Sequence, residues 1–248
     1  MSAAPLGRSV EAQVAVELRL TARRGENLLA LAGIPAVVLL LFGSTSLVDV
    51  PGDAPVDYLL PGALALAVVA AGLVNLGIAT AYERSYGVLR RLGASPLGRP
   101  GLLAAKMASI LAVVAVQAIA LVAVAWAALA WRPAEGASLA VLVATLVLGA
   151  ITMTALGLLL AGTLRAEATL ALANGLFILA VVIGGVVVPT TALPAALAVV
   201  ADLLPFAALS GALRIALGTA PAEIEPFVVL AAWATLATIL AAARFRWD

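Results

Sequence analysis

The stretch Met107–Trp131 decides the fold class. It reads MASILAVVAVQAIALVAVAWAALAW, which is 25 residues without one charged side chain. A helix that crosses a bilayer needs about 20 mostly apolar residues. This run is apolar around the whole circumference of a helix, and the alternation typical of a half-buried strand is absent. The stretch therefore predicts a membrane-spanning helix.

Five more charge-poor runs resemble it. Together the six predicted spans lie near residues 28–48, 58–82, 107–131, 139–164, 168–188 and 227–243. The 248 residues are 65% hydrophobic and 11% charged, whereas a soluble domain averages about 45–50% apolar and about 25% charged residues. A chain of this size has too little interior to bury so much apolar surface in water. We expect an all-α integral membrane protein whose residues 1–248 form a single transmembrane domain, and we exclude a soluble enzyme, a disordered segment and a nucleic-acid binder.

The distribution of basic residues predicts the orientation. Twelve of the 14 Lys and Arg residues fall in the N-terminal tail, the loops after the second and fourth spans, and the C-terminus. Only Arg132 and Arg214 fall on the other side. Because cytoplasmic loops are enriched in Lys and Arg, both termini are expected in the cytoplasm. Residues 1–27 are then expected to form a cytoplasmic N-terminal helix, either lying at the membrane interface or exposed to solvent.

The segment before the last span is too long for one crossing. No charged residue occurs from Ala168 to Ala201, and prolines at positions 189 and 194 are expected to break any helix there. A second apolar piece follows Pro205 and contains Arg214. Residues 189–226 are therefore expected to form an external hairpin of two short re-entrant helices, with Pro189, Pro194, Pro205 and Arg214 as its characteristic residues. The alternative is a long tilted fifth span followed by a helix lying flat on the interface.

Several kinds of chemistry are missing from the sequence. It has no Cys and no His, so we expect no metal site, no cofactor bound by this chain and no catalytic activity of its own. Its single lysine, Lys106, does not stand in a phosphate-binding P-loop pattern, so ATP and Mg, if they are used, bind another chain. The predicted spans contain no ionisable side chain in their cores, which argues against coupling to an ion gradient.

Neutral polar residues inside the predicted spans are the candidates for a substrate path. The four that we single out are Asn75, Gln117, Thr152 and Asn174. Such side chains suit the polar end of an amphipathic substrate. They equally suit hydrogen bonds between helices, each worth about 0.6–2 kcal/mol in a bilayer, and the sequence leaves both interpretations open.

The predicted cytoplasmic loop 83–100 is the sharpest local feature. Five charged residues gather there within 17 positions: Glu83, Arg84, Arg90, Arg91 and Arg99. Leu89 and Leu92 are three residues apart and share one face of a helix, and Pro96 follows as a helix stop. Such a short charged helix suits docking into a groove on a soluble partner. The alternative is an ordinary cluster of basic residues that fixes topology.

The same loop resembles the coupling segment of the type-two family of ATP-binding-cassette (ABC) exporter membrane subunits. The matching residues are Glu83, Arg84, Gly87, Leu89, Arg90, Leu92 and Pro96, and Arg91 lies among them. Residues Val188–Ala195 and Leu204–Arg214 are similar to the family's outer-leaflet hairpin. Six spans and an N-terminal surface helix agree with this resemblance.

The resemblance implies a multi-pass permease subunit in the plasma (inner) membrane. A cytoplasmic ABC ATPase would bind ATP and Mg and contact the coupling loop, and a second permease copy or a homologous permease would complete the path through the lipid. Lipophilic drugs, antibiotics or lipids are the implied substrates, and multidrug efflux is the implied role. The alternatives are a transporter driven by an ion gradient and a membrane scaffold that transports nothing.

Overall fold

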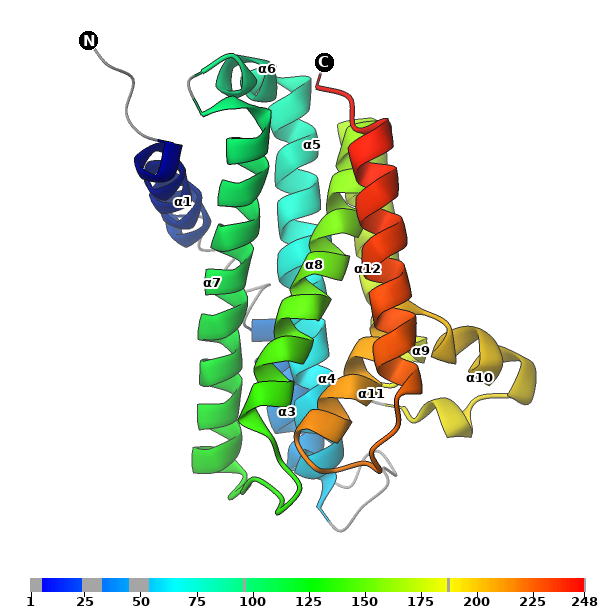
Figure 1. Cartoon of the computed structure of the whole chain (residues 1–248). Coiled ribbons are helices and arrows are strands. Elements are labelled where there is room, and N and C mark those ends of the chain that lie inside the picture. Colours follow the sequence, from blue (N-terminus) through cyan, green and yellow to red (C-terminus); the bar gives the residue numbers. More distant parts are fainter. Residues whose placement is uncertain (1–5, 24–32, 45–53, 96, 187, 248) are drawn as a thin grey trace.

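The computed structural model describes residues 6–23, 33–44, 54–95, 97–186 and 188–247. All regular structure in these ranges is helical, so the expected all-α fold is confirmed for them. Most of the helices run side by side as one bundle (Figure 1). In chain order they are α1 (Leu6–Arg23), α3 (Ile34–Gly43), α4 (Pro55–Val69), the π-helix η2 (Ala70–Leu76), α5 (Gly77–Ser85), α6 (Val88–Gly93), α7 (Gly98–Ala128), α8 (Leu139–Thr163), α9 (Ala166–Ile183), the short 3-10 helix η3 (Thr190–Ala192), α10 (Ala195–Asp202), α11 (Pro205–Ala216) and α12 (Glu225–Arg244).

Five of the described helices are long and apolar enough to cross a membrane: Pro55–Ser85, Gly98–Ala128, Leu139–Thr163, Ala166–Ile183 and Glu225–Arg244. The first of these joins α4, η2 and α5 end to end, and 89% of its apolar window is buried inside the protein, against 22–44% for the other four. It is the central helix of the bundle. The predicted span near 28–48 contains α3, which is 10 residues long; residues 28–32 and 45–48 of that prediction lie outside the described residues.

The third spanning helix begins earlier than the sequence suggested. The sequence predicts a start at Met107, because the charged Lys106 directly precedes it. In the structure α7 already begins at Gly98, since residues 102–105 are Leu and Ala, which favour helix, and Pro100 falls in the first turn, where proline is tolerated. Lys106 is therefore inside a spanning helix and not in the loop.

The central helix packs on α8 backbone to backbone. A Cβ atom on Gly157 of α8 would come within 2.5 Å of the carbonyl oxygen of Gly72 in η2. Only glycine permits this approach. In lipid no hydrophobic effect drives helices together, and close packing of small residues is a common way for them to associate. The π-helix occurs at this contact.

The segment before the last span forms the expected hairpin. Helix α9 ends at Ile183, before the predicted end at 188, because Gly184 and Gly185 stop it ahead of Pro189. Pro189 and Pro194 directly precede η3 and α10, and Pro205 is the first residue of α11. The pair α10 and α11 is bent by 77° and does not form one straight span. In Figure 1, α10 protrudes from the bundle, whereas α11 packs inside it against α4, α8 and α12.

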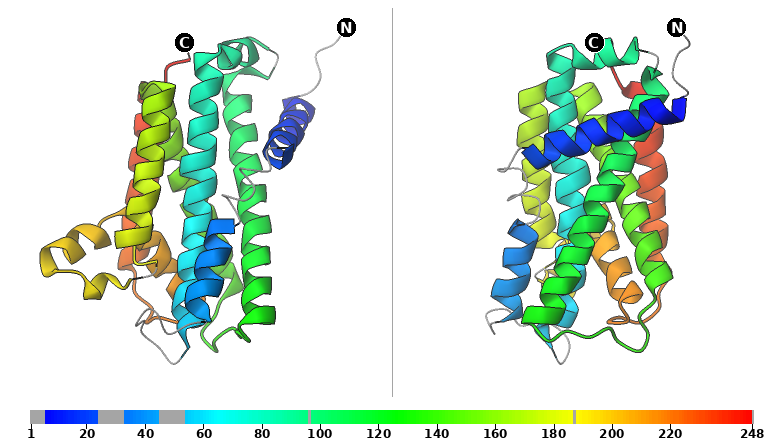
Figure 2. Two further views of the ribbon diagram at one scale, coloured as in Figure 1. Left: turned by 180° about the vertical axis from the view of Figure 1, so that it is seen from behind. Right: turned by 90° about the vertical axis from the view of Figure 1, so that its left-hand side faces the viewer.

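Helix α1 lies across the outside of the bundle and contacts α7 (Figure 2). The start of α1, the end of α12 and α6 lie at the same end of the bundle (Figure 1). This arrangement is the one expected if α1 rests on one membrane surface and α6 projects from it. Residues 1–5 and 24–27 of the predicted N-terminal helix lie outside the described residues.

Candidate functional site: the coupling segment and the groove beside it

The predicted coupling segment contains a turn and a short helix beyond the end of α5. After Ser85 the chain reverses through Gly87, whose φ of 70° is left-handed, and then forms α6. Leu89 is buried against Leu97 and Leu102 and fixes one face of α6 to α7. Arg90 and Arg91 are exposed on the other face, and Leu92 is half-buried. Pro96 lies outside the described residues.

Glu83 and Arg84 point back into the protein. The Glu83 carboxylate lies 2.7 Å from the Nζ atom of Lys106, and Arg84 donates a hydrogen bond to the carbonyl oxygen of Leu164, between α8 and α9. These two side chains therefore tie the segment to the bundle, while Arg90 and Arg91 face outward. The sequence motif is divided between residues that tie the segment to the bundle and residues that are exposed.

Lys106 sits between two carboxylates. Its side chain is 1% exposed, and its Nζ atom also donates a hydrogen bond to Glu17 of α1 at 3.2 Å. The side chains of Glu17 and Glu83 are 13% and 22% exposed. A lysine is almost never fully buried unless it is paired, so this cluster links the surface helix α1, the spanning helix α7 and the start of the coupling segment.

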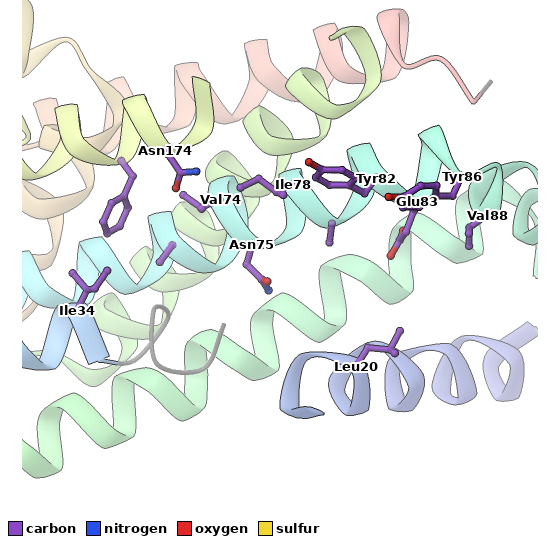
Figure 3. A pocket seen from close by; sticks show the side chains of 13 residues that line it. Leu20, Ile34, Val74, Asn75, Ile78, Tyr82, Glu83, Tyr86, Val88 and Asn174 are labelled. Carbon is purple, nitrogen blue, oxygen red and sulfur yellow. The ribbon is translucent and has the colours of Figure 1, made fainter. Parts of the chain in front are cut away.

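A groove with a volume of about 620 Å³ runs along the central helix. Its lining comes from α1, α3, η2, α5, α9 and the coupling segment. The lining residues are Leu20, Ile34, Ala70, Val74, Asn75, Ile78, Ala79, Tyr82, Glu83, Tyr86, Val88, Asn174 and Phe177. Figure 3 shows that Asn75 and Asn174 border one part of the groove and that Glu83 and Tyr86 border another. The groove is thus mostly apolar with a few polar groups, as sites for small amphipathic molecules are.

Two of the four predicted path residues lie on this groove, and two do not. Asn75 and Asn174 line it, and Asn174 is exposed, with its amide donating to the carbonyl oxygen of Leu170 at 2.9 Å. Gln117 is 6% exposed on α7 and is not part of the groove. Thr152 is fully buried and donates to the carbonyl oxygens of Leu148 at 2.8 Å and Leu230 at 3.4 Å. The structure therefore uses Thr152 to join α8 to α12, because a buried hydroxyl must find acceptors.

A second polar cluster joins α11, α4 and the end of α9, away from the cluster around Lys106. The Arg214 guanidinium donates to the carbonyl oxygen of Gly185 and, at 3.4 Å, to the hydroxyl of Ser210. It also stacks 3.9 Å above the ring of Tyr58. The Tyr58 hydroxyl donates to Gly185, and Ser210 donates to Gly184, both at 2.9 Å. A cation at the C-terminal end of a helix is favourable, so Arg214 caps the end of α9 and fixes α11 against the central helix.

The described residues contain no group of three His, Cys, Asp or Glu side chains placed to hold a metal ion. Their polar clusters serve to join helices and to face a groove. No nucleophile activated by a neighbouring base is found in either cluster.

Sequence reasoning missed three members of these clusters. The predicted spans exclude Lys106, the sequence pattern does not point to Glu17, and Tyr58 enters the prediction only as the first residue of a span. A lone lysine among apolar residues is a signal for a buried ion pair, and following the helix back from Met107 to Gly98 would have found it. No local pattern points to Tyr58, since its partner Gly185 is 127 residues away.

Spanning helices, a surface helix and a bent apolar pair together define a multi-pass membrane protein. A family model described as ABC-2 type transporter matches residues 10–217. The chain belongs to this family, and it is the permease component of an ABC transporter and not itself an enzyme. No curated protein matched the sequence.

Proposed function

We propose that this permease exports lipophilic drugs, antibiotics or lipids, and that a separate cytoplasmic ABC ATPase, which binds ATP and Mg, drives it through the coupling segment. A second permease copy or a homologous permease would face this one and complete the path. The groove lined by the described residues is partly open, which supports a path completed by a second permease.

One observation carries the proposal: the groove and the coupling segment share residues. Glu83, Tyr86 and Val88 line the groove together with Asn75 and Asn174. A smaller hollow of about 30 Å³ is lined by Asn75, Glu83 and Lys106. Displacement of α6 by an ATPase would move Val88 directly and would act on Tyr86 and Glu83 through the turn at Gly87.

The composition of the groove supports an amphipathic substrate. Its lining is largely aliphatic and aromatic, while two amides offer hydrogen bonds to a polar head. A ligand-driven switch requires that ATP-bound ATPase binds one permease state better than the other. Because α6 is connected to the groove wall, binding of the ATPase at α6 can change the affinity of the groove for the substrate.

Filling the groove tests the proposal. Ala79→Trp places an indole in the groove, and Ala120→Trp places one on an exposed part of α7 away from it. Both variants are assayed with the ATPase for ATP-dependent uptake of a fluorescent phospholipid analogue and of a lipophilic dye into inverted vesicles. We expect Ala79→Trp to abolish uptake without loss of ATPase binding, and Ala120→Trp to transport normally. Normal uptake by Ala79→Trp would refute the assignment of the groove.

The two alternatives predict different results in the same vesicles. A transporter driven by an ion gradient stops when an uncoupler dissipates the gradient in the presence of ATP, whereas the proposed exporter continues. A membrane scaffold moves neither probe under any condition.

A further inference from the structure

Phe245 and Trp247, which follow α12, pack beside α6 against the cluster that contains Leu89. The backbone amide of Arg246 donates to the carbonyl oxygen of Gly162 at 3.1 Å, at the end of α8. A Cβ atom on Gly162 would come within 2.5 Å of the Phe245 ring, so glycine is what allows the tail to lie there. Phe245 packs edge-on against Trp247 at 5.0 Å, and the Arg99 guanidinium lies 4.9 Å from the Trp247 ring. The tail is thus fixed on both sides.

Trp247 stands between two hollows that flank α6. One, of about 650 Å³, lies between α6 and the turn from α8 to α9; the other, of about 620 Å³, lies between α6, the start of α7 and the C-terminal tail. Both are lined by Arg90 and Trp247. Their further basic lining residues are Arg84, Arg91, Arg99, Arg165 and Arg246.

The described part of this surface is strongly basic. Among the described residues that line either hollow, Glu167 is the only acidic one. The two ion pairs found within the described ranges are both formed by Lys106. Within those ranges, the arginines that line the two hollows therefore form no ion pair with a carboxylate. Arginine and tryptophan are also the residues that most often dominate the binding energy of protein interfaces.

We propose that the C-terminal residues Phe245–Trp247 and the α8–α9 turn at Arg165 join α6 in one docking surface for an acidic, carboxylate-bearing element of the ATPase chain. The inference rests on the proposed function. It extends the contact with the ATPase from the coupling segment to two further parts of the chain, the α8–α9 turn and residues Phe245–Trp247. Charge complementarity selects the partner, because guanidinium groups bind carboxylates through paired hydrogen bonds. The position of α6 across the end of the bundle (Figure 1) directs the surface along the bundle axis and away from lipid tails.

The test uses the full-length chain in nanodiscs and the ATPase that co-purifies with it, identified by its P-loop sequence. The variants are Trp247→Ala and Arg165→Glu. The matched control is Trp126→Ala on α7. It removes another tryptophan that lies beside an arginine, with its ring centre 5.1 Å from the Arg132 guanidinium. The dissociation constant is measured at low and high salt, in nanodiscs of phosphatidylcholine alone and in nanodiscs rich in phosphatidylglycerol.

We expect each docking-surface variant to weaken ATPase binding about tenfold or more, with a smaller salt dependence for Arg165→Glu, in both kinds of nanodisc. The control should bind like the wild type. Wild-type affinity in both variants overturns the inference while leaving the proposed function intact. A loss confined to phosphatidylglycerol nanodiscs also overturns it, because the surface is then a site for anionic lipid. If the wild-type chain binds no ATPase at all, both proposals fail.

Discussion

Removing the ammonium group of Lys106 should release helix α1 and the coupling segment together. Lys106→Met keeps most of the side-chain volume and leaves Glu17 and Glu83 facing each other without their shared cation, which lies 3.2 Å and 2.7 Å from them. Breaking a buried ion pair by removing one partner costs about 3–5 kcal/mol. Because these carboxylates are 13% and 22% exposed and can turn toward water, we expect the lower end, about 3 kcal/mol.

The loss is measured by thermal unfolding in detergent, followed by tryptophan fluorescence. For a chain of this length 1 kcal/mol corresponds to about 2–4 °C, so Tm should fall by about 6–12 °C. Arg19→Met is the control, since it removes an exposed cation from α1 itself and should cost below about 0.5 kcal/mol.

A triple variant separates loss of the ion cluster from loss of packing. Replacing all three members, as Glu17→Gln, Glu83→Gln and Lys106→Met, removes the unpaired charges, and replacing a whole buried ion cluster by neutral groups is often close to neutral. We therefore expect the triple variant to recover most of the Tm. An unchanged Tm in Lys106→Met, or a triple variant less stable than the single one, would refute this reasoning.

Three further predictions concern the packing of the bundle. Gly157→Val should cost about 3 kcal/mol or more, because its side chain meets backbone 2.5 Å away, whereas Gly175→Val on α9 meets nothing within 4 Å and should leave Tm unchanged; equal effects would contradict the close contact. Tyr58→Phe removes the hydrogen bond to Gly185 and should cost about 1 kcal/mol in the same unfolding assay, and a gain in stability would be contrary to the capping role of this cluster. Thr152→Val should lower stability by about 1 kcal/mol and leave transport unchanged, and a transport defect with normal Tm would restore Thr152 to the substrate path.

The sequence was sufficient for the features that composition and helix breakers control. Long apolar runs dictate spanning helices, and the prolines at 189, 194 and 205 dictate short pieces in place of one long helix. For Asn75 and Asn174 the sequence left a substrate path and helix–helix hydrogen bonds open. The structure places both residues on the groove, and Asn174 also donates to the carbonyl oxygen of Leu170.

The remaining features depend on partners far apart in the chain. Lys106 was treated as a loop residue because a charge normally ends a span, yet Glu17, 89 positions away, helps to neutralise it inside the helix. Arg214 is accommodated in the bundle by the carbonyl groups at the broken end of α9 and by the face of Tyr58. Thr152 is a predicted path residue, but its buried hydroxyl donates hydrogen bonds to backbone carbonyl groups of α8 and α12. Pairings of this kind are set by how the helices pack and not by local sequence.

The most direct test of the central claim is transport by the purified chain in liposomes with and without its ATPase. When the ATPase and ATP are on the side of the membrane that carries α6, the phospholipid analogue should be transported across the bilayer. Vanadate should stop this transport, and an uncoupler should not. Without the ATPase the chain should transport nothing. Full transport in liposomes that hold the permease alone would contradict the claim that an external ATPase powers it through the coupling segment.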